Sequence, residues 1–305
     1  LLTHVIFGFN SENTTTRGSF SNAHFAFAKK KTGRVAFMGG SITEMNGYRP
    51  MLVAWLENKF PQTKFEFINA GISSTCSTTG AFRLQRDILD HGPIDLFFLE
   101  FAVNDDQDAG HSKEACIRGM EGIIRQMRTK SPKTDLAVTY FVNQGMLNQL
   151  KEGKTPLPMG AHEQVLEKYG VSRIHLAREL AHQIKEGSFS WEKFGGTHPK
   201  EPGNRLCANM HIEMLEKAWT GKNIKDPRKR KIPSNPIDEN SYFNGRFLSP
   251  AKVSLTDGWK FSEPNWKSLP GGKRKRYLER SLLHCETPGK PIQIKFKGRA
   301  IGAFV

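Results

Sequence analysis

Strand-length apolar runs alternate with segments of helical apolar spacing between residues 31 and 221, and this alternation limits the fold more than any other feature. The predicted strands are 34–39, 64–70, 95–103 and 135–142, with a short one at 171–176. The predicted helices are 48–60, 79–89, 112–127, 161–169, 177–185 and 203–219. Strands joined through helices need crossover connections, which predict an α/β fold with a parallel sheet. In such sheets functional groups gather at the carboxyl ends of the strands.

Positive charge is concentrated in the last part of the chain. Of the formal net charge of +15, residues 221–305 carry +12, from 19 Lys/Arg against 7 Asp/Glu. The Pro-rich basic stretch 222–236 cannot continue a helix and is predicted to be a linker. We therefore predict an N-terminal extension (1–30), an α/β domain (31–221), this linker, and a β-rich accessory module (237–305).

The accessory module is predicted from short apolar runs at 242–243, 259–261 and 292–296, which Gly, Pro and Asn separate. About 70 residues are few for a β-sandwich. The module is therefore expected to be incomplete, or to be completed by the aromatic segment 7–27.

Composition excludes several classes of protein. With 37% hydrophobic residues the chain can bury a core, so it is not disordered throughout, and no apolar run is long enough to span a membrane. Cys76, Cys116, Cys207 and Cys285 form no CxxC or Cys/His motif, so we expect buried thiols and neither a zinc site nor a disulfide-dense scaffold. One disulfide between distant cysteines is the alternative. The first residue is Leu1, from which we expect a removed targeting segment and a secreted or periplasmic protein.

Four short motifs carry groups that could perform chemistry. Ser41 follows two glycines at the end of the first predicted strand, where an exposed hydroxyl beside free N–H groups suits a nucleophile. The alternative is a glycine-rich turn in which the serine caps the next helix. Gly71 and Asn104 follow the next two strands and could donate to an oxyanion, although each alone is an ordinary turn residue. His198 lies in a glycine-rich loop before the last helix, a setting for a general base.

In order and spacing these motifs resemble the four blocks of the SGNH hydrolases, also called the GDSL-like lipase/acylhydrolase superfamily, over about residues 31–221. The resemblance implies a flavodoxin-like three-layer α/β/α sandwich. It implies that Ser41 is the nucleophile and His198 the base, and that Ser41 N–H, Gly71 N–H and the Asn104 amide form an oxyanion hole. The mechanism so implied needs no metal and no cofactor.

The chain departs from the family pattern at two positions. Ala102 stands where the third block usually has Gly, and Gly195 stands where an acid normally precedes the histidine by three residues. Glu192 is one substitute for that acid, and a main-chain carbonyl is another. We expect a Ser-His dyad oriented by the backbone, which would lower the rate without abolishing nucleophilic attack.

The expected substrate is a small acyl group, such as acetyl, on a polar carrier, because the sequence has no long apolar lid. The pattern at 294–302 resembles jelly-roll modules that accompany carbohydrate esterases, which favours a carbohydrate substrate.

Two alternatives stay open. One is an inactive scaffold whose basic clusters at 228–231 and 273–276 bind an acidic polysaccharide or another polyanion, and the other is an O-acyltransferase. Nucleic acid is not expected, because no RNA-binding or zinc-finger motif is present. The oligomeric state is not predicted.

Overall fold

The computed structural model describes residues 8–250, 253–256, 258–273, 278–286, 291–299 and 301–303 of the 305-residue chain. The chain divides into two compact units, Leu1–Arg246 and Phe247–Val305. The predicted motifs Ser41, Gly71, Asn104 and His198 all belong to the first unit.

The first unit contains a six-stranded sheet with the order β1-β6-β5-β4-β2-β3. Its strands are β1 (Thr14–Thr15), β2 (Thr32–Gly39), β3 (Lys64–Gly71), β4 (Leu96–Leu99), β5 (Asp135–Thr139) and β6 (Ser172–Ile174). Pairs among β2 to β6 are parallel, and only β1 runs antiparallel, at the edge. The predicted parallel α/β sheet is therefore confirmed.

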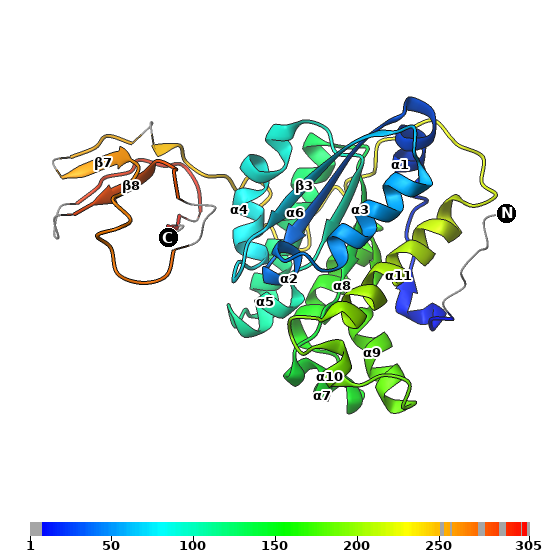
Figure 1. Cartoon of the computed structure of the whole chain (residues 1–305). Coiled ribbons are helices and arrows are strands. Elements are labelled where there is room, and N and C mark those ends of the chain that lie inside the picture. Colours follow the sequence, from blue (N-terminus) through cyan, green and yellow to red (C-terminus); the bar gives the residue numbers. More distant parts are fainter. Residues whose placement is uncertain are drawn as a thin grey trace. The chain divides into compact units, whose positions relative to one another are not determined.

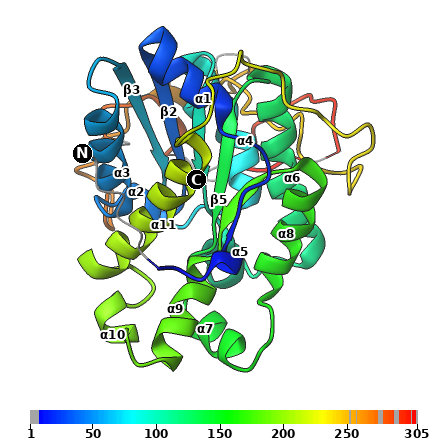
Figure 2. The same cartoon turned by 90° about the vertical axis from the view of Figure 1, so that its right-hand side faces the viewer.

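Helices cover both faces of this sheet (Figures 1 and 2). One layer contains α1 (Ser21–Phe25), α3 (Tyr48–Lys59), α9 (Leu176–Lys185) and α11 (Glu201–Trp219). The other contains α4 (Ser77–Asp87), α6 (Lys113–Lys130) and α8 (Leu157–Tyr169). The short helices are α2 (Ser41–Glu44), α5 (Ala102–Gln107), α7 (Gln144–Lys151) and α10 (Trp191–Phe194), and the single turns are η1 (Ser11–Asn13), η2 (Ala26–Lys30) and η3 (Leu89–His91). Because both faces are covered, all four residues of β4 are buried.

The two longest predicted strands end earlier than expected. The apolar run 95–103 forms a strand only to Leu99, and the run 135–142 only to Thr139. In both places the chain stays buried beyond the strand, as Phe101 and Phe141 show, so hydrophobicity alone does not mark the strand end. Ala102 and Asn104 consequently lie in helix α5 rather than on a strand or a loop.

The N-terminal segment packs on the first unit and does not complete the accessory module, so that part of the expectation was wrong. Strand β1 pairs with β6, and Phe20 and Phe27 are buried in the core. The Trp219 indole at the end of α11 donates to the Phe20 carbonyl oxygen at 2.9 Å. Residues 8–30 therefore belong to the α/β unit, and their buried aromatic side chains form part of its core.

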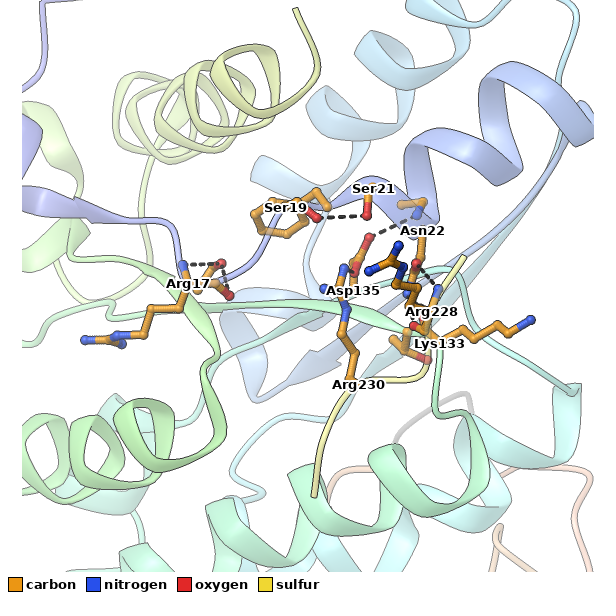
Figure 3. A network of polar contacts seen from close by, with 12 residues as sticks. Arg17, Ser19, Ser21, Asn22, Lys133, Asp135, Arg228 and Arg230 are labelled. Atoms are coloured by element: carbon orange, nitrogen blue, oxygen red, sulfur yellow. Dashed lines mark hydrogen bonds and ion pairs between the residues drawn. The ribbon is translucent and has the colours of Figure 1, made fainter. Parts of the chain in front are cut away.

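The basic stretch after α11 is anchored at the amino end of β5 (Figure 3). Asn22 Oδ1 accepts from Arg228 N at 2.9 Å, while Asn22 Nδ2 donates to the carbonyl oxygens of Arg228 at 2.8 Å and of Lys133 at 2.7 Å. Arg230 pairs with the buried Asp135 carboxylate. Further along, buried Glu121 accepts from the backbone N–H of Ile237 and Asp238. Part of the positive charge of 222–236 is therefore paired with a buried carboxylate of the α/β unit.

The second unit contains a two-stranded antiparallel sheet of β7 (Trp259–Ser262) and β8 (Leu282–Cys285). The run 259–261 is thus confirmed as a strand, whereas β8 was not predicted. The runs 242–243 and 292–296 are not strands, and this part of the prediction was wrong. In the cluster 273–276 only Lys273 lies within the described residues.

Within the described residues no helix is long and apolar enough to cross a membrane. The four cysteines are free thiols, of which Cys76, Cys116 and Cys207 are buried and Cys285 is half-buried.

Asn22 gives a test of how the basic stretch is held. Replacing it with Ala removes three part-buried hydrogen bonds to the backbone of Arg228 and Lys133, so we expect Asn22→Ala to lower the free energy of unfolding by about 2–3 kcal/mol. Urea unfolding of the full chain measures the loss. The control is Ser21→Ala, which removes only an exposed hydrogen bond to Ser19 and should change stability by less than about 0.5 kcal/mol. Equal effects of the two variants would contradict the anchoring role.

Candidate active site

The four predicted motifs converge at the carboxyl edge of the sheet. In the strand register Gly39 of β2 lies beside Gly71 of β3, and Met38 lies beside Leu99 of β4. The chain leaves these three strands at the same level, and α2 and α5 begin there (Figure 1). This arrangement places Ser41, Gly71 and Asn104 at one edge.

Ser41 and His198 form a hydrogen-bonded pair. Ser41 Oγ lies 2.8 Å from His198 Nε2, although 157 residues separate them in the sequence. Ser41 is half-buried and His198 is exposed, so the pair is open to solvent. A serine hydroxyl at this distance from an imidazole nitrogen has the geometry for proton transfer.

Two glycines allow the remaining motifs to approach Ser41. A Cβ atom at Gly40 would lie 2.1 Å from Asn104 Oδ1, and one at Gly71 would lie 2.3 Å from the backbone N of Glu44 in α2. Side chains at these positions would therefore push Asn104 and β3 away from the serine turn. The two glycines therefore let both candidate oxyanion donors approach the 40–44 turn, which contains Ser41.

The candidate oxyanion donors already have acceptors. Gly71 N–H donates to Asn69 Oδ1 at 3.0 Å, and Asn104 Nδ2 donates to Asp108 Oδ2 at 2.7 Å. An amide nitrogen carries two hydrogens, so Asn104 can make a second hydrogen bond. Ser41 is the first residue of α2, and its N–H therefore has no acceptor within the helix. A ligand oxygen would share or replace the Asn69 contact to reach all three donors.

No carboxylate is bound to His198 among the described residues. Among the described residues, the structure gives His198 no hydrogen bond or ion pair except the contact to Ser41, so neither Glu192 nor a main-chain carbonyl is bound to its Nδ1. A side chain at position 195 does not fit, since Gly195 has a φ of +105° and its Cβ would lie 2.3 Å from Lys200 N. The local backbone thus explains why the usual acid is missing here.

Asn204 positions the histidine loop, and the sequence interpretation missed it. It is buried, its Nδ2 donates to the Pro199 carbonyl oxygen at 2.6 Å, and its Oδ1 accepts from Tyr48 N at 2.8 Å. Tyr48 begins α3, the helix after the serine turn. One amide side chain therefore links the residue after His198 to the chain just beyond Ser41.

Glu100 holds the serine turn, residues 40–44, through hydrogen bonds, and the sequence interpretation also missed it. Its Oε1 accepts from Gly40 N at 2.9 Å and from Thr43 Oγ1 at 2.8 Å. Its Oε2 has no hydrogen-bond partner among the described residues. Burial raises the pKa of the Glu100 carboxyl to about 7, and the hydrogen bonds from Thr43 and Gly40 lower it less than burial raises it. A charged residue inside the apolar run 95–103 was the sequence signal for this role.

The raised pKa of Glu100 makes stability depend on pH. Between about pH 4.5 and 7 the folded protein holds a proton that the unfolded chain has released, so the free energy of unfolding falls as pH rises. The Glu100→Gln side chain does not titrate, so this fall is absent in the variant. We expect the free energy of unfolding of the variant minus that of wild type to increase by on the order of 2–3 kcal/mol from pH 4.5 to pH 8. Urea unfolding at several pH values measures it.

The matched control is Glu57→Gln, on the exposed side of α3. The free energy of unfolding of this variant should change with pH as that of wild type does. A constant difference between Glu100→Gln and wild type at every pH would show that Glu100 does not titrate in this way.

Comparison with solved structures supports the fold. A two-domain esterase (CEX) active on acetylated mannans matches with a TM-score of 0.71 at 21% identity, over 90% of this chain and 72% of that one. Its complex co-crystallised with mannopentaose gives 0.67 at 21% identity, over 90% and 71%. LAE5, an alpha/beta hydrolase enzyme from the metagenome of Lake Arreo, Spain, gives 0.51 at 14% identity, over 62% and 97%. At these identities the likeness concerns the fold alone.

No curated protein sequence matches this chain. The family model of the GDSL-like lipase/acylhydrolase family matches residues 37–206, more than half of the chain and the stretch that holds Ser41, Gly71, Asn104 and His198. The chain therefore belongs to the GDSL-like lipase/acylhydrolase family and is a carboxylic ester hydrolase.

Proposed function

We propose that this protein removes acetyl groups from an acetylated carbohydrate through a Ser41–His198 dyad. The observation that carries the proposal is the 2.8 Å contact between Ser41 Oγ and His198 Nε2 at the carboxyl edge of the sheet. Membership of the family supplies the reaction class, ester hydrolysis.

The reaction follows from this geometry in two steps. His198 Nε2 takes the proton of Ser41 Oγ as the oxygen attacks the ester carbonyl, and the imidazolium then protonates the departing sugar oxygen. A water molecule, deprotonated by the same nitrogen, attacks the acetyl-serine and releases acetate while Ser41 Oγ regains its proton. Ser41 N–H, Gly71 N–H and Asn104 Nδ2 donate to the carbonyl oxygen as it becomes negative.

The dyad works without a carboxylate on His198. The Asn204 bridge to Pro199 and Tyr48 limits how far the imidazole can move from Ser41. Electrostatic help from an acid is absent among the described residues, so the rate is expected to be lower than that of a complete triad. Removal of the serine still abolishes the covalent route, and removal of the histidine slows it.

An accessible site favours a small acyl group on a large carrier. His198 is exposed and Ser41 is half-buried, so a polysaccharide chain can approach them without passing through a channel. A solved structure of the same fold belongs to an esterase active on acetylated mannans, and that protein was co-crystallised with mannopentaose. A polysaccharide substrate also fits the proposed secreted or periplasmic location, and an acidic glycan remains a proposed partner for the basic residues.

Acetate release tests the proposal. We expect wild type to deacetylate acetylated mannan and 4-nitrophenyl acetate, and Ser41→Ala and His198→Ala to lower kcat/KM by about 10³-fold or more. The control Ser188→Ala changes an exposed serine and should keep full activity. Acetylated mannan left intact while the aryl ester is cleaved would refute the carbohydrate substrate. Full activity in Ser41→Ala would refute the nucleophile, and acetyl transfer to an added sugar in preference to water would indicate an O-acyltransferase.

A further inference from the structure

A cluster of two thiols, two imidazoles and one carboxylate lies where three helices begin. Cys76 precedes α4, Asp105 is in α5, His111 lies between α5 and α6, and Cys116 is in the first turn of α6. His162 reaches the same place from α8. In the sequence Cys76 and His162 lie far from the segment 105–116 that holds the other three, and the five residues match no metal-binding motif, so the fold brings them together.

Two groups of three possible ligand atoms meet at Asp105. Cys76 Sγ, an Asp105 oxygen and a His111 ring nitrogen lie within 4.8 Å of one another, and so do an Asp105 oxygen, Cys116 Sγ and a His162 ring nitrogen. His111 is within hydrogen-bonding reach of both thiols. Its Nδ1 lies 3.3 Å from Asp105 Oδ1 but has no hydrogen-bond partner among the described residues. The two groups therefore share Asp105, and His111 contacts the thiol of each group.

The Asp105 carboxylate is held as a metal ligand would be. Its Oδ2 accepts from Ser77 Oγ at 2.7 Å and contacts His162 Nε2 at 2.8 Å, while Oδ1 accepts from Ser77 N at 2.8 Å. These contacts fix the orientation of the carboxylate and leave Oδ1 directed at His111. Such outer contacts are typical of residues that orient metal ligands.

The donor set selects the class of ion. Thiolate and imidazole ligands with one carboxylate suit Zn²⁺, whereas Mg²⁺ and Ca²⁺ prefer oxygen ligands. Tetrahedral Zn²⁺ with bonds of about 2.0–2.3 Å separates its ligand atoms by roughly 3.4–3.8 Å. Within each group of three the ligand atoms lie within 4.8 Å of one another, so one shared ion has to draw the two thiols toward Asp105 and His111.

We propose that Cys76, Cys116, His111 and Asp105 bind one Zn²⁺ ion, with His162 holding the second oxygen of Asp105. Each thiol releases its proton on binding, so the ion meets two thiolates, one carboxylate and one neutral imidazole. The four protein ligands fill a tetrahedron and leave no position for substrate, which makes the ion structural. It ties the starts of α4, α5 and α6 together, next to Asn104.

Metal titration of the reduced full chain, stripped with a chelator, tests the site. We expect one equivalent of Zn²⁺ to bind and to raise Tm by about 5–10 °C when zinc is 100-fold above its Kd. Co²⁺ should give thiolate charge-transfer absorption. Alkylation followed by peptide mapping should show Cys76 and Cys116 protected by zinc.

Variants identify the ligands. Cys76→Ser and His111→Ala should weaken zinc binding at least about 10-fold and lose the Tm shift, whereas the control Cys285→Ser, in the second unit, should bind as wild type. His111 is at the surface side of the cluster, and Cys76→Ser changes a single atom, so at least one variant will fold. Substoichiometric binding by wild type, or binding unchanged in these variants, would overturn the proposal. So would oxidation of Cys76 and Cys116 to a disulfide in a chain that takes up no zinc.

Discussion

The close approach of three strand ends, which the missing side chains of Gly40 and Gly71 permit, is the constraint on which the rest of the site depends. At both positions a Cβ atom would overlap a neighbour, the Asn104 side chain in one case and the α2 backbone in the other. The parallel register of β2, β3 and β4 brings the three chain segments to one level, and Glu100 then holds the serine turn through Gly40 N and Thr43 Oγ1. Asn204 adds the histidine loop from α11.

Much of the α/β unit could be predicted because its signals are local. Alternating apolar runs mark the parallel sheet, and glycine, serine, asparagine and histidine follow the strand ends in an order that resembles one family. The strand ends themselves could not be predicted, because Phe101 and Phe141 are as buried as the strands before them. The contacts of Glu100 and Asn204 depend on residues far away in the sequence, and so does the grouping of Cys76 with His111.

The positive charge of the chain has more than one role. Arg230 pairs with the buried Asp135 carboxylate, and Asn22 binds the Arg228 backbone. This part of the basic stretch is therefore attached to the α/β unit. Charge density in the sequence predicted a polyanion surface there, since sequence does not show which cations have internal partners.

The central claim is that Ser41, activated by His198, forms the covalent intermediate. Treatment of the full chain with a serine-directed phosphonate ester, followed by peptide mapping, tests it most directly. The account predicts one phosphonyl group on Ser41, formed at least about 10²-fold more slowly in His198→Ala because the general base is lost. Modification of another residue, or an active enzyme whose Ser41 stays unmodified, would contradict it.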